Sequence, residues 1–121
     1  KFKNNNREAP YISLTLPAHK DRENFNVEKL ESEVDLFVIM GYDYNSTSDP
    51  DAVSPLQSEG IFSLTNTIAY FKAVNLNLSK TILALPYYGI LWDISIKKDE
   101  SIEAVVERKL TYSEIKNLFL E

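Results

Sequence analysis

Three apolar runs along the chain predict strands of a sheet. Residues 11–16 alternate between apolar and polar side chains and are closed by Pro17, as expected of a strand with one buried face. Residues 34–40 are almost uniformly apolar, which is typical of a parallel strand covered on both faces. Residues 81–86 form a third buried run, which ends at a proline.

Two helices are expected between these strands. Residues 24–33 carry isolated apolar side chains among charged ones, which favours a short helix. Apolar side chains at spacings of three and four predict a second helix that runs to about residue 74; they are Ile61, Leu64, Ile68 and Phe71. A polar loop with turn signals, residues 42–60, precedes it. The order strand, helix, strand, loop, helix, strand amounts to two βαβ units that share a strand, and therefore to a parallel sheet.

The last quarter of the chain has a different pattern. Residues 87–92 are rich in aromatic side chains and are expected to form a loop, and residues 94–98 alternate like a half-exposed strand. Residues 102–109 are charged and fit neither a helix nor a strand clearly. Thr111 and Glu114 have the spacing of a capping box, so a final helix is expected to open there.

Composition narrows the possible functions. The 121 residues carry a net charge of −5 and contain no cysteine, which excludes a disulfide scaffold, a zinc finger and a thiol nucleophile. A pI near 4.9 argues against nucleic acid or an anionic membrane as the main partner. The longest apolar stretch, residues 82–92, is interrupted by Pro86 and Gly89 and is too short for a membrane span. Length alone predicts a single globular domain.

Polar and aromatic side chains follow the ends of two predicted strands. Tyr42 and Asp43 come after the run that ends at residue 40, and Tyr87 and Tyr88 come after the third run. Ligand sites in parallel α/β folds form at the carboxyl ends of strands. With Tyr44 and Trp92, these side chains could stack on a sugar ring and bond its hydroxyls. The alternative is that they cap the strands and form an aromatic plug at the end of the sheet.

Other candidate residues give weaker signals. His19 is the only histidine and is expected to be an ordinary loop residue. Asp49, Asp51 and Glu59 could supply oxygen atoms to a hard cation, but their spacing matches no calcium loop, so solvated carboxylates are the preferred interpretation and no metal site or cofactor is expected. Glycosylation patterns occur at residues 45–47 and 77–79, and such short patterns arise by chance.

Two linked motifs resemble the chitinase-like glycoside hydrolases of family 18. Residues 34–44 are similar to the family's sixth barrel strand, an apolar strand that closes in M-x-Y-D, here Met40-Gly41-Tyr42-Asp43. Residues 80–89 resemble its seventh strand, with the ending Leu85-Pro86-Tyr87-Tyr88-Gly89, and residues 11–18 fit the fifth strand more weakly. The resemblance covers roughly residues 10–92. It implies an α/β fold: a partial TIM (β/α)8 barrel with parallel strands in residues 1–93, followed in residues 94–121 by the start of a small α+β insertion.

The resemblance also implies an activity and roles for particular residues. Members cleave β-1,4 bonds next to N-acetylglucosamine, and the substrate's own acetamido oxygen acts as the nucleophile. By this resemblance, Tyr42 bonds the acetamido group, Asp43 holds the sugar, and Met40 lines the floor of the cleft. Tyr87 and Tyr88 lie at its rim, and Trp92 is a further candidate for substrate binding. No cofactor is implied.

The chain departs from the family pattern in two places. No DxxDxDxE run, whose last residue is the general acid, occurs in the 121 residues, and Ile90 stands where many members have an arginine. This chain alone is therefore not expected to be active. We expect a carboxy-proximal portion of a hydrolase for chitin, chito-oligosaccharides or peptidoglycan, which needs the remainder of the barrel or a larger assembly as its partner. The alternatives are an inactive chitinase-like module that binds sugar and a small α/β domain with a chance likeness. Secretion or a cell-envelope location is expected from the resemblance.

Overall fold

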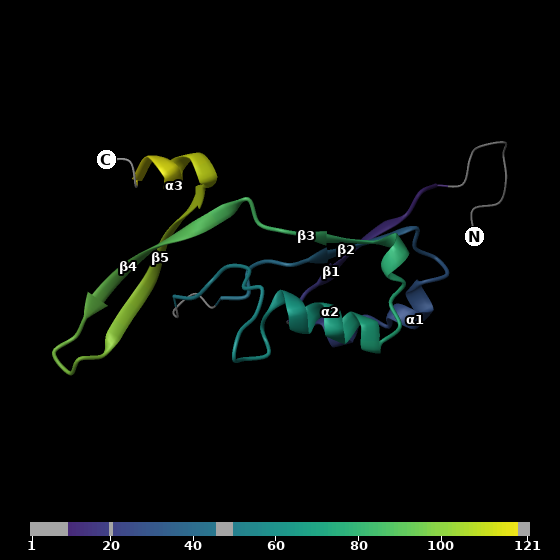
Figure 1. Ribbon diagram of the computed structural model, residues 1–121, viewed down its shortest axis with the longest axis horizontal. Coiled ribbons are helices and arrows are strands. Elements are labelled where there is room, and N and C mark those ends of the chain that lie inside the picture. The colour runs from purple at the N-terminus through teal and green to yellow at the C-terminus, as the bar shows by residue number, and fades with distance from the viewer. Residues whose placement is uncertain (1–9, 20, 46–49, 119–121) are drawn as a thin grey trace.

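The computed structural model describes residues 10–19, 21–45 and 50–118. Its amino-terminal part is a three-stranded sheet that carries helices, and its carboxy-terminal part is a long two-stranded hairpin followed by a short helix (Figure 1). The two parts are joined by the short segment after the third strand. The fold therefore alternates strands and helices first and changes to an antiparallel pair at the end.

The three predicted strands are present and form one parallel sheet. β1 (Ser13–Pro17), β2 (Leu36–Met40) and β3 (Thr81–Ala84) lie in the order β1-β2-β3, with β2 in the centre. β1 and β2 each begin two residues later than their apolar runs, β1 extends through Pro17, and β3 ends two residues earlier than its run. The expectation of a parallel sheet built from two βαβ units is confirmed, because β2 pairs with both neighbours in the parallel sense.

Both predicted helices form, with shorter bounds than the sequence pattern indicates. α1 (Val27–Leu30) is a single turn capped by the side chain of Asn26 and follows a 3-10 turn, η1 (Arg22–Asn24). α2 (Leu64–Ala73) begins only after Ser63, whose hydroxyl accepts a hydrogen bond from the Asn66 amide. Ile61 is therefore outside the helix and two-thirds exposed, because the chain is still in the preceding loop there.

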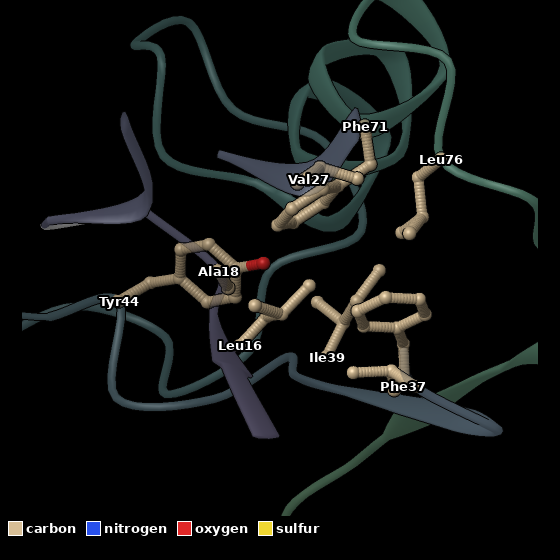
Figure 2. Packing of buried hydrophobic residues seen from close by; sticks show 9 residues of the cluster. Leu16, Ala18, Val27, Phe37, Ile39, Tyr44, Phe71 and Leu76 are labelled. Atoms are coloured by element: carbon tan, nitrogen blue, oxygen red, sulfur yellow. The ribbon is translucent and has the colours of Figure 1, made fainter. Parts of the chain in front are cut away.

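The hydrophobic core lies between the sheet and α2. Phe37 and Ile39 of β2 are fully buried, and they face Phe71 of α2 and Leu76 in the segment that follows it (Figure 2). Leu16 of β1 is buried beside them. Full burial of a side chain of this size stabilises the fold by about 1.5–3 kcal/mol. The packing fixes β1 and β2 next to each other, so the loops that follow these strands also meet.

The prediction of an aromatic loop at residues 87–92 is wrong. Residues from Tyr88 onward belong to β4 (Tyr88–Ile96), which pairs antiparallel with β5 (Ile102–Thr111). The 3-10 turn η2 (Leu78–Lys80) leads into β3, and β3 continues through residues 85–87 into this hairpin. The aromatic composition of residues 87–92 suggested a loop, whereas pairing with the distant, charged β5 satisfies the backbone hydrogen-bonding groups of β4 as a strand. The expected division between residues 93 and 94 falls inside β4.

The predicted capping box at the last helix is confirmed. α3 (Tyr112–Leu118) follows β5 directly. The Thr111 hydroxyl and amide both donate to Oε2 of Glu114 at 2.7 Å, and the Glu114 amide donates back to the Thr111 hydroxyl at 3.4 Å. These bonds lower the pKa of Glu114, the backbone bond most. The box turns the chain sharply from strand into helix.

Candidate functional site

The chain turns away from the sheet directly after β2, at Gly41. The Gly41 amide donates to the carbonyl oxygen of Ala84 at 2.9 Å, so β2 and β3 are still paired at this point. A Cβ atom on Gly41 would lie 2.7 Å from Leu64 Cδ2 and 2.9 Å from Leu83 Cδ1. Only glycine fits so close to these neighbours without displacing them. Tyr42 and Asp43 leave the sheet from this tight crossing, and Asp43 has a left-handed backbone with φ 56°, which aspartate tolerates better than most residues.

The carboxylate of Asp43 is held by two side chains from the hairpin. The Tyr88 hydroxyl donates to its Oδ1 at 2.5 Å. The Lys109 ammonium donates to Oδ1 at 3.0 Å and to Oδ2 at 3.1 Å. Lys109 Nζ also lies 4.6 Å from the centre of the Tyr88 ring, within the range of a cation–π contact. A single polar cluster is therefore formed by Asp43 from the loop after β2, Tyr88 of β4 and Lys109 of β5.

These contacts set the charge of each group in the cluster. Partial burial by itself would raise the pKa of Asp43, but the hydrogen bonds from Tyr88 and Lys109, together with the lysine's charge, lower that pKa overall. Burial, followed by the bond to Asp43 and its negative charge, raises the pKa of Tyr88. The hydrogen bond with Asp43 also raises the pKa of Lys109. At neutral pH the cluster is therefore an ion pair with a protonated phenol that donates to it.

His19 supports Asp43 from the loop after β1. Its Nε2 lies 2.9 Å from the backbone carbonyl oxygen of Asp43, and since a carbonyl only accepts, Nε2 carries the proton. The imidazole lies between the rings of Tyr44 and Phe62, with centroids 5.1 Å from each. The sequence pattern indicated an ordinary loop residue; the structure places His19 in the wall of the site, with a role in holding the backbone of Asp43.

A buried hydrogen-bond chain fixes the loops around the site to α2. The hydroxyl of Thr67 donates to the carbonyl oxygen of Ala18 at 3.0 Å. Tyr44 lies 2.7 Å from the same hydroxyl, and because the threonine proton is already used, Tyr44 is the donor in this bond. Tyr44 is 6% exposed. It is therefore part of the core rather than a free sugar-stacking ring, and it anchors the chain one residue after Asp43.

A hollow of about 280 Å³ opens between the loops that follow β1 and β2. It is lined by three of the residues singled out from the sequence, Met40, Tyr42 and Asp43. The rest of the wall comes from the last residue of β1 and the loop after it, and consists of Pro17, Ala18, His19 and Asp21. The hollow thus lies at the carboxyl ends of two neighbouring parallel strands, where the fold leaves backbone and side chains free to meet a ligand.

Of the aromatic residues predicted after the third strand, Tyr88 lies beside Tyr42 and Asp43, whereas Tyr87 and Trp92 do not. The ring of Tyr88 contacts that of Tyr42 edge-on, with centroids 6.4 Å apart. Tyr87 is 84% exposed and lies beside Tyr112 of α3. Trp92 lies four residues further along β4 than Tyr88, opposite Val106 and just past a shift in the strand pairing.

Lys109 and His19 are the site residues that sequence reasoning missed. Lys109 lies in the segment of unclear pattern, and its position depends on the register that pairs it with Ile90. If the hairpin had been predicted, Lys109 would have been a candidate site residue, because it is opposite Ile90 and therefore close to Tyr88. His19 had no comparable signal in the sequence.

The other sequence candidates gather into no site in the described ranges. Among the described residues, no three histidine, aspartate or glutamate side chains are placed to hold a metal ion. Asp49 and part of the pattern at residues 45–47 lie outside the described residues. Asn77, in the second glycosylation pattern, caps η2 by accepting from the Ser79 amide and hydroxyl. In the described part of the chain, no helix is long and apolar enough to cross a membrane.

Comparison with known proteins identifies the family. The profile described as Glycosyl hydrolases family 18 matches residues 1–119. No curated protein matches the chain in sequence. The class V chitinase of Nicotiana tobaccum is 18% identical with a TM-score of 0.74, and the match covers 94% of this chain and 38% of that one.

Two further solved structures have the same fold. A family 18 chitinase of Cycas revoluta in complex with (GlcNAc)3 is 18% identical with a TM-score of 0.71, over 91% of this chain and 36% of that chain. A chitinase-like agglutinin of Robinia pseudoacacia is 21% identical with a TM-score of 0.73, over 92% of this chain and 36% of that chain. The chain thus spans just over a third of the length of these proteins.

The matches explain the two parts of the fold. The parallel sheet with its helices is a portion of a TIM barrel, and the hairpin with α3 opens a small α+β insertion. The hollow and the Asp43 cluster therefore lie at the barrel face where TIM-barrel enzymes place their active sites. Both the profile and the fold lead to one conclusion: the chain belongs to glycosyl hydrolase family 18.

Proposed function

We propose that this chain supplies the supporting half of a sugar site in a glycoside hydrolase that cleaves β-1,4 bonds next to N-acetylglucosamine. The substrate class is chitin, chito-oligosaccharide or peptidoglycan glycan. The acetamido oxygen of the substrate attacks the anomeric carbon as the bond to the leaving oxygen breaks, and water then opens the cyclic intermediate with retention of configuration. A glutamic acid that protonates the leaving oxygen comes from another segment, since no DxxDxDxE run occurs in these residues.

The observation that carries this proposal is the cluster of Asp43, Tyr88 and Lys109 beside the hollow. A carboxylate fixed by two partners and still 48% exposed is suited to accept hydrogen bonds from sugar hydroxyls. It lies next to Tyr42 and Met40, which line the same hollow. The combination of an oriented acceptor, a phenol and an apolar surface matches the mixed character of a pyranose ring.

Each residue has a role that follows from its position. Tyr42 is half-buried, and its hydroxyl has no hydrogen-bond partner among the described residues, so it is available to bond the acetamido group. Asp43 holds the sugar, Met40 forms the floor, and the ring of Tyr88 borders the site. Tyr87, beside Tyr112, and Trp92, opposite Val106, lie outside this cluster and would meet only more distant units of a longer glycan.

A second candidate function is sugar binding without cleavage. The agglutinin of Robinia pseudoacacia has the same fold at a TM-score of 0.73, so this fold also occurs in a protein named for binding. The residues of this chain serve either function, because the groups described here orient sugar and do not donate the proton to the leaving group. The glutamate at the end of the missing motif distinguishes the two: an enzyme needs it, and a binding module does not.

A secreted or envelope-bound protein is the setting that suits such a substrate. The rest of the barrel is the partner that completes the cleft around the glycan.

The test is incubation of the full-length protein with the N-acetylglucosamine tetramer, with products followed by proton NMR. A retaining hydrolase releases new reducing ends in the β configuration before they mutarotate. Initial release of the α anomer would contradict the proposed mechanism. Binding without any cleavage would select the lectin-like function, and neither binding nor cleavage would overturn both.

A further inference from the structure

Lys109 lies at a point where the strand register gives it access to Asp43. It is opposite Ile90 in the β4–β5 pairing, and Tyr88 is opposite Thr111. Because alternate residues of a strand share a face, Lys109 and Tyr88 lie diagonally on the same face of the hairpin. Ile90 is hydrophobic and cannot pair with a carboxylate. The cation that contacts Asp43 comes instead from the opposite strand, β5.

The hydrogen bonds on Asp43 leave little freedom to its carboxylate. An ionised carboxylate has about four acceptor positions, two on each oxygen. Oδ1 receives both Tyr88 and Lys109, and Oδ2 receives only Lys109. One position therefore remains, on Oδ2. Without Lys109 the carboxylate could rotate about the Cβ–Cγ bond of Asp43, and three of its acceptor positions would be free.

These bonds also tie the hairpin to the barrel strands. Three hydrogen bonds from the β4–β5 hairpin, one from Tyr88 and two from Lys109, end on the Asp43 carboxylate in the loop after β2. The edge contact between the rings of Tyr42 and Tyr88 lies next to it. A group that orients the carboxylate thus also holds the hairpin beside the hollow.

We propose that Lys109 is a positioning residue of the sugar site, which fixes the Asp43 carboxylate so that a single acceptor position on Oδ2 meets a ligand hydroxyl. The inference rests on the proposed function, because that function provides the sugar. Lys109 acts through Asp43, because its ammonium donates to both oxygens of that carboxylate. Substrate recognition at this point therefore depends on a residue of the insertion as well as on the barrel.

The experiment compares three variants in the full-length protein. Lys109→Met removes the charge and keeps the aliphatic stem, and Lys109→Arg restores a cation that can bond both oxygens. Lys97→Met is the matched control, because Lys97 is in the same hairpin, is 53% exposed against 54% for Lys109, and pairs with Glu103 at 3.4 Å. If Lys109→Met does not fold, Lys109→Gln takes its place.

Two readouts are measured for each variant. The first is the carboxyl carbon signal of Asp43 in a pH titration by NMR, assigned with Asp43→Asn. The groups around this carboxylate are Tyr88 of β4, Lys109 of β5, and His19 and Asp21 from the loop after β1. The second readout is the affinity for the N-acetylglucosamine tetramer by calorimetry.

Lys109→Met is expected to raise the titration midpoint of Asp43 and to weaken tetramer binding by about threefold to tenfold, as loss of an exposed charged hydrogen bond does. Lys109→Arg restores both values, and Lys97→Met changes neither. An unchanged Asp43 titration in Lys109→Met overturns the inference. So does a shifted titration with unchanged affinity. If the wild-type protein binds no tetramer, the proposed function fails, and the titration still decides whether Lys109 fixes the carboxylate.

Discussion

The hydroxyl oxygen of Tyr88 lies 2.5 Å from Oδ1 of Asp43, across 45 positions of sequence. This bond joins the first residue of the hairpin to the loop after the central barrel strand. The donor belongs to the hairpin and the acceptor to the loop after the parallel sheet. The geometry of the site therefore depends on how the hairpin packs against the sheet.

Replacing Tyr88 with phenylalanine removes this donor and leaves the ring in place. We expect Tyr88→Phe to lower the free energy of unfolding by about 0.5–1 kcal/mol, because the bond is charged but partly exposed. It should also bring the pKa of Asp43 closer to its ordinary value. Thermal melts and an NMR titration measure the two effects. Tyr112→Phe, at a tyrosine 61% exposed in α3, is the control, and equal behaviour of the two variants would contradict the assignment.

Gly41 is expected to tolerate no side chain. Gly41→Ala places a Cβ 2.7 Å from Leu64, 2.9 Å from Leu83 and 3.0 Å from the Ala84 carbonyl oxygen. Relief of these contacts displaces α2 or β3, at a cost of about 1–3 kcal/mol in unfolding free energy. Gly60→Ala is the matched control, since its Cβ would meet only Ser58 Oγ, at 3.9 Å. Denaturant melts compare them; a Gly41→Ala protein as stable as Gly60→Ala would show that the crossing is looser than described.

The buried hydroxyl of Thr67 is expected to matter more than an exposed one. Thr67→Val leaves the buried Tyr44 hydroxyl without its partner and removes one of the two side-chain donors to the Ala18 carbonyl oxygen, the other being Arg22, at a cost of about 1–3 kcal/mol. Thr65→Val, at an exposed hydroxyl that donates to the Leu56 carbonyl oxygen, should cost less. Equilibrium unfolding of both variants checks the order, and the reverse order would argue against the hydrogen-bond chain.

The pH dependence of stability follows from the lowered pKa of Asp43. Partial burial opposes the shift, but the bonds from Tyr88 and Lys109 outweigh it, so the folded pKa lies below the value of 3.8 for an unperturbed aspartate. The unfolded chain then binds the proton first. The stabilisation is complete above the unfolded pKa and is lost as the pH falls through the folded pKa.

Asp43→Asn tests this pH dependence. At neutral pH the variant should be less stable than the wild type by about 0.2–1 kcal/mol, as for an exposed ion pair, and the difference should shrink below about pH 4. Melting temperatures across that range provide the measurement. A difference in melting temperature between the two proteins that does not vary with pH would mean that the charge of the Asp43 carboxylate contributes nothing to stability.

The parts of the fold that the sequence predicted are those with local signals. Three apolar runs marked β1, β2 and β3, and the spacing of Thr111 and Glu114 marked the start of α3. The motif around Tyr42 and Asp43 also pointed to the end of β2, where the hollow was found. Each of these features depends on residues close together in the chain.

The parts that were missed depend on distant contacts. Residues 87–92 were expected to form an aromatic loop, and nothing near them shows that a charged segment about fifteen residues later pairs with them as a strand. Lys109 belongs to the site only through that pairing. His19 belongs to it only because β1 and β2 are neighbours, which brings the loops after them together.

The central claim is that the residues after β2 bind N-acetylglucosamine units, and the most direct measurement is the affinity of the full-length protein for the tetramer, with and without the Tyr42 hydroxyl. We expect Tyr42→Phe to weaken binding by about tenfold, as loss of one hydrogen bond to a ligand does. Tyr11→Phe, at an exposed tyrosine before β1, should bind like the wild type. Equal affinity in all three proteins would contradict the claim.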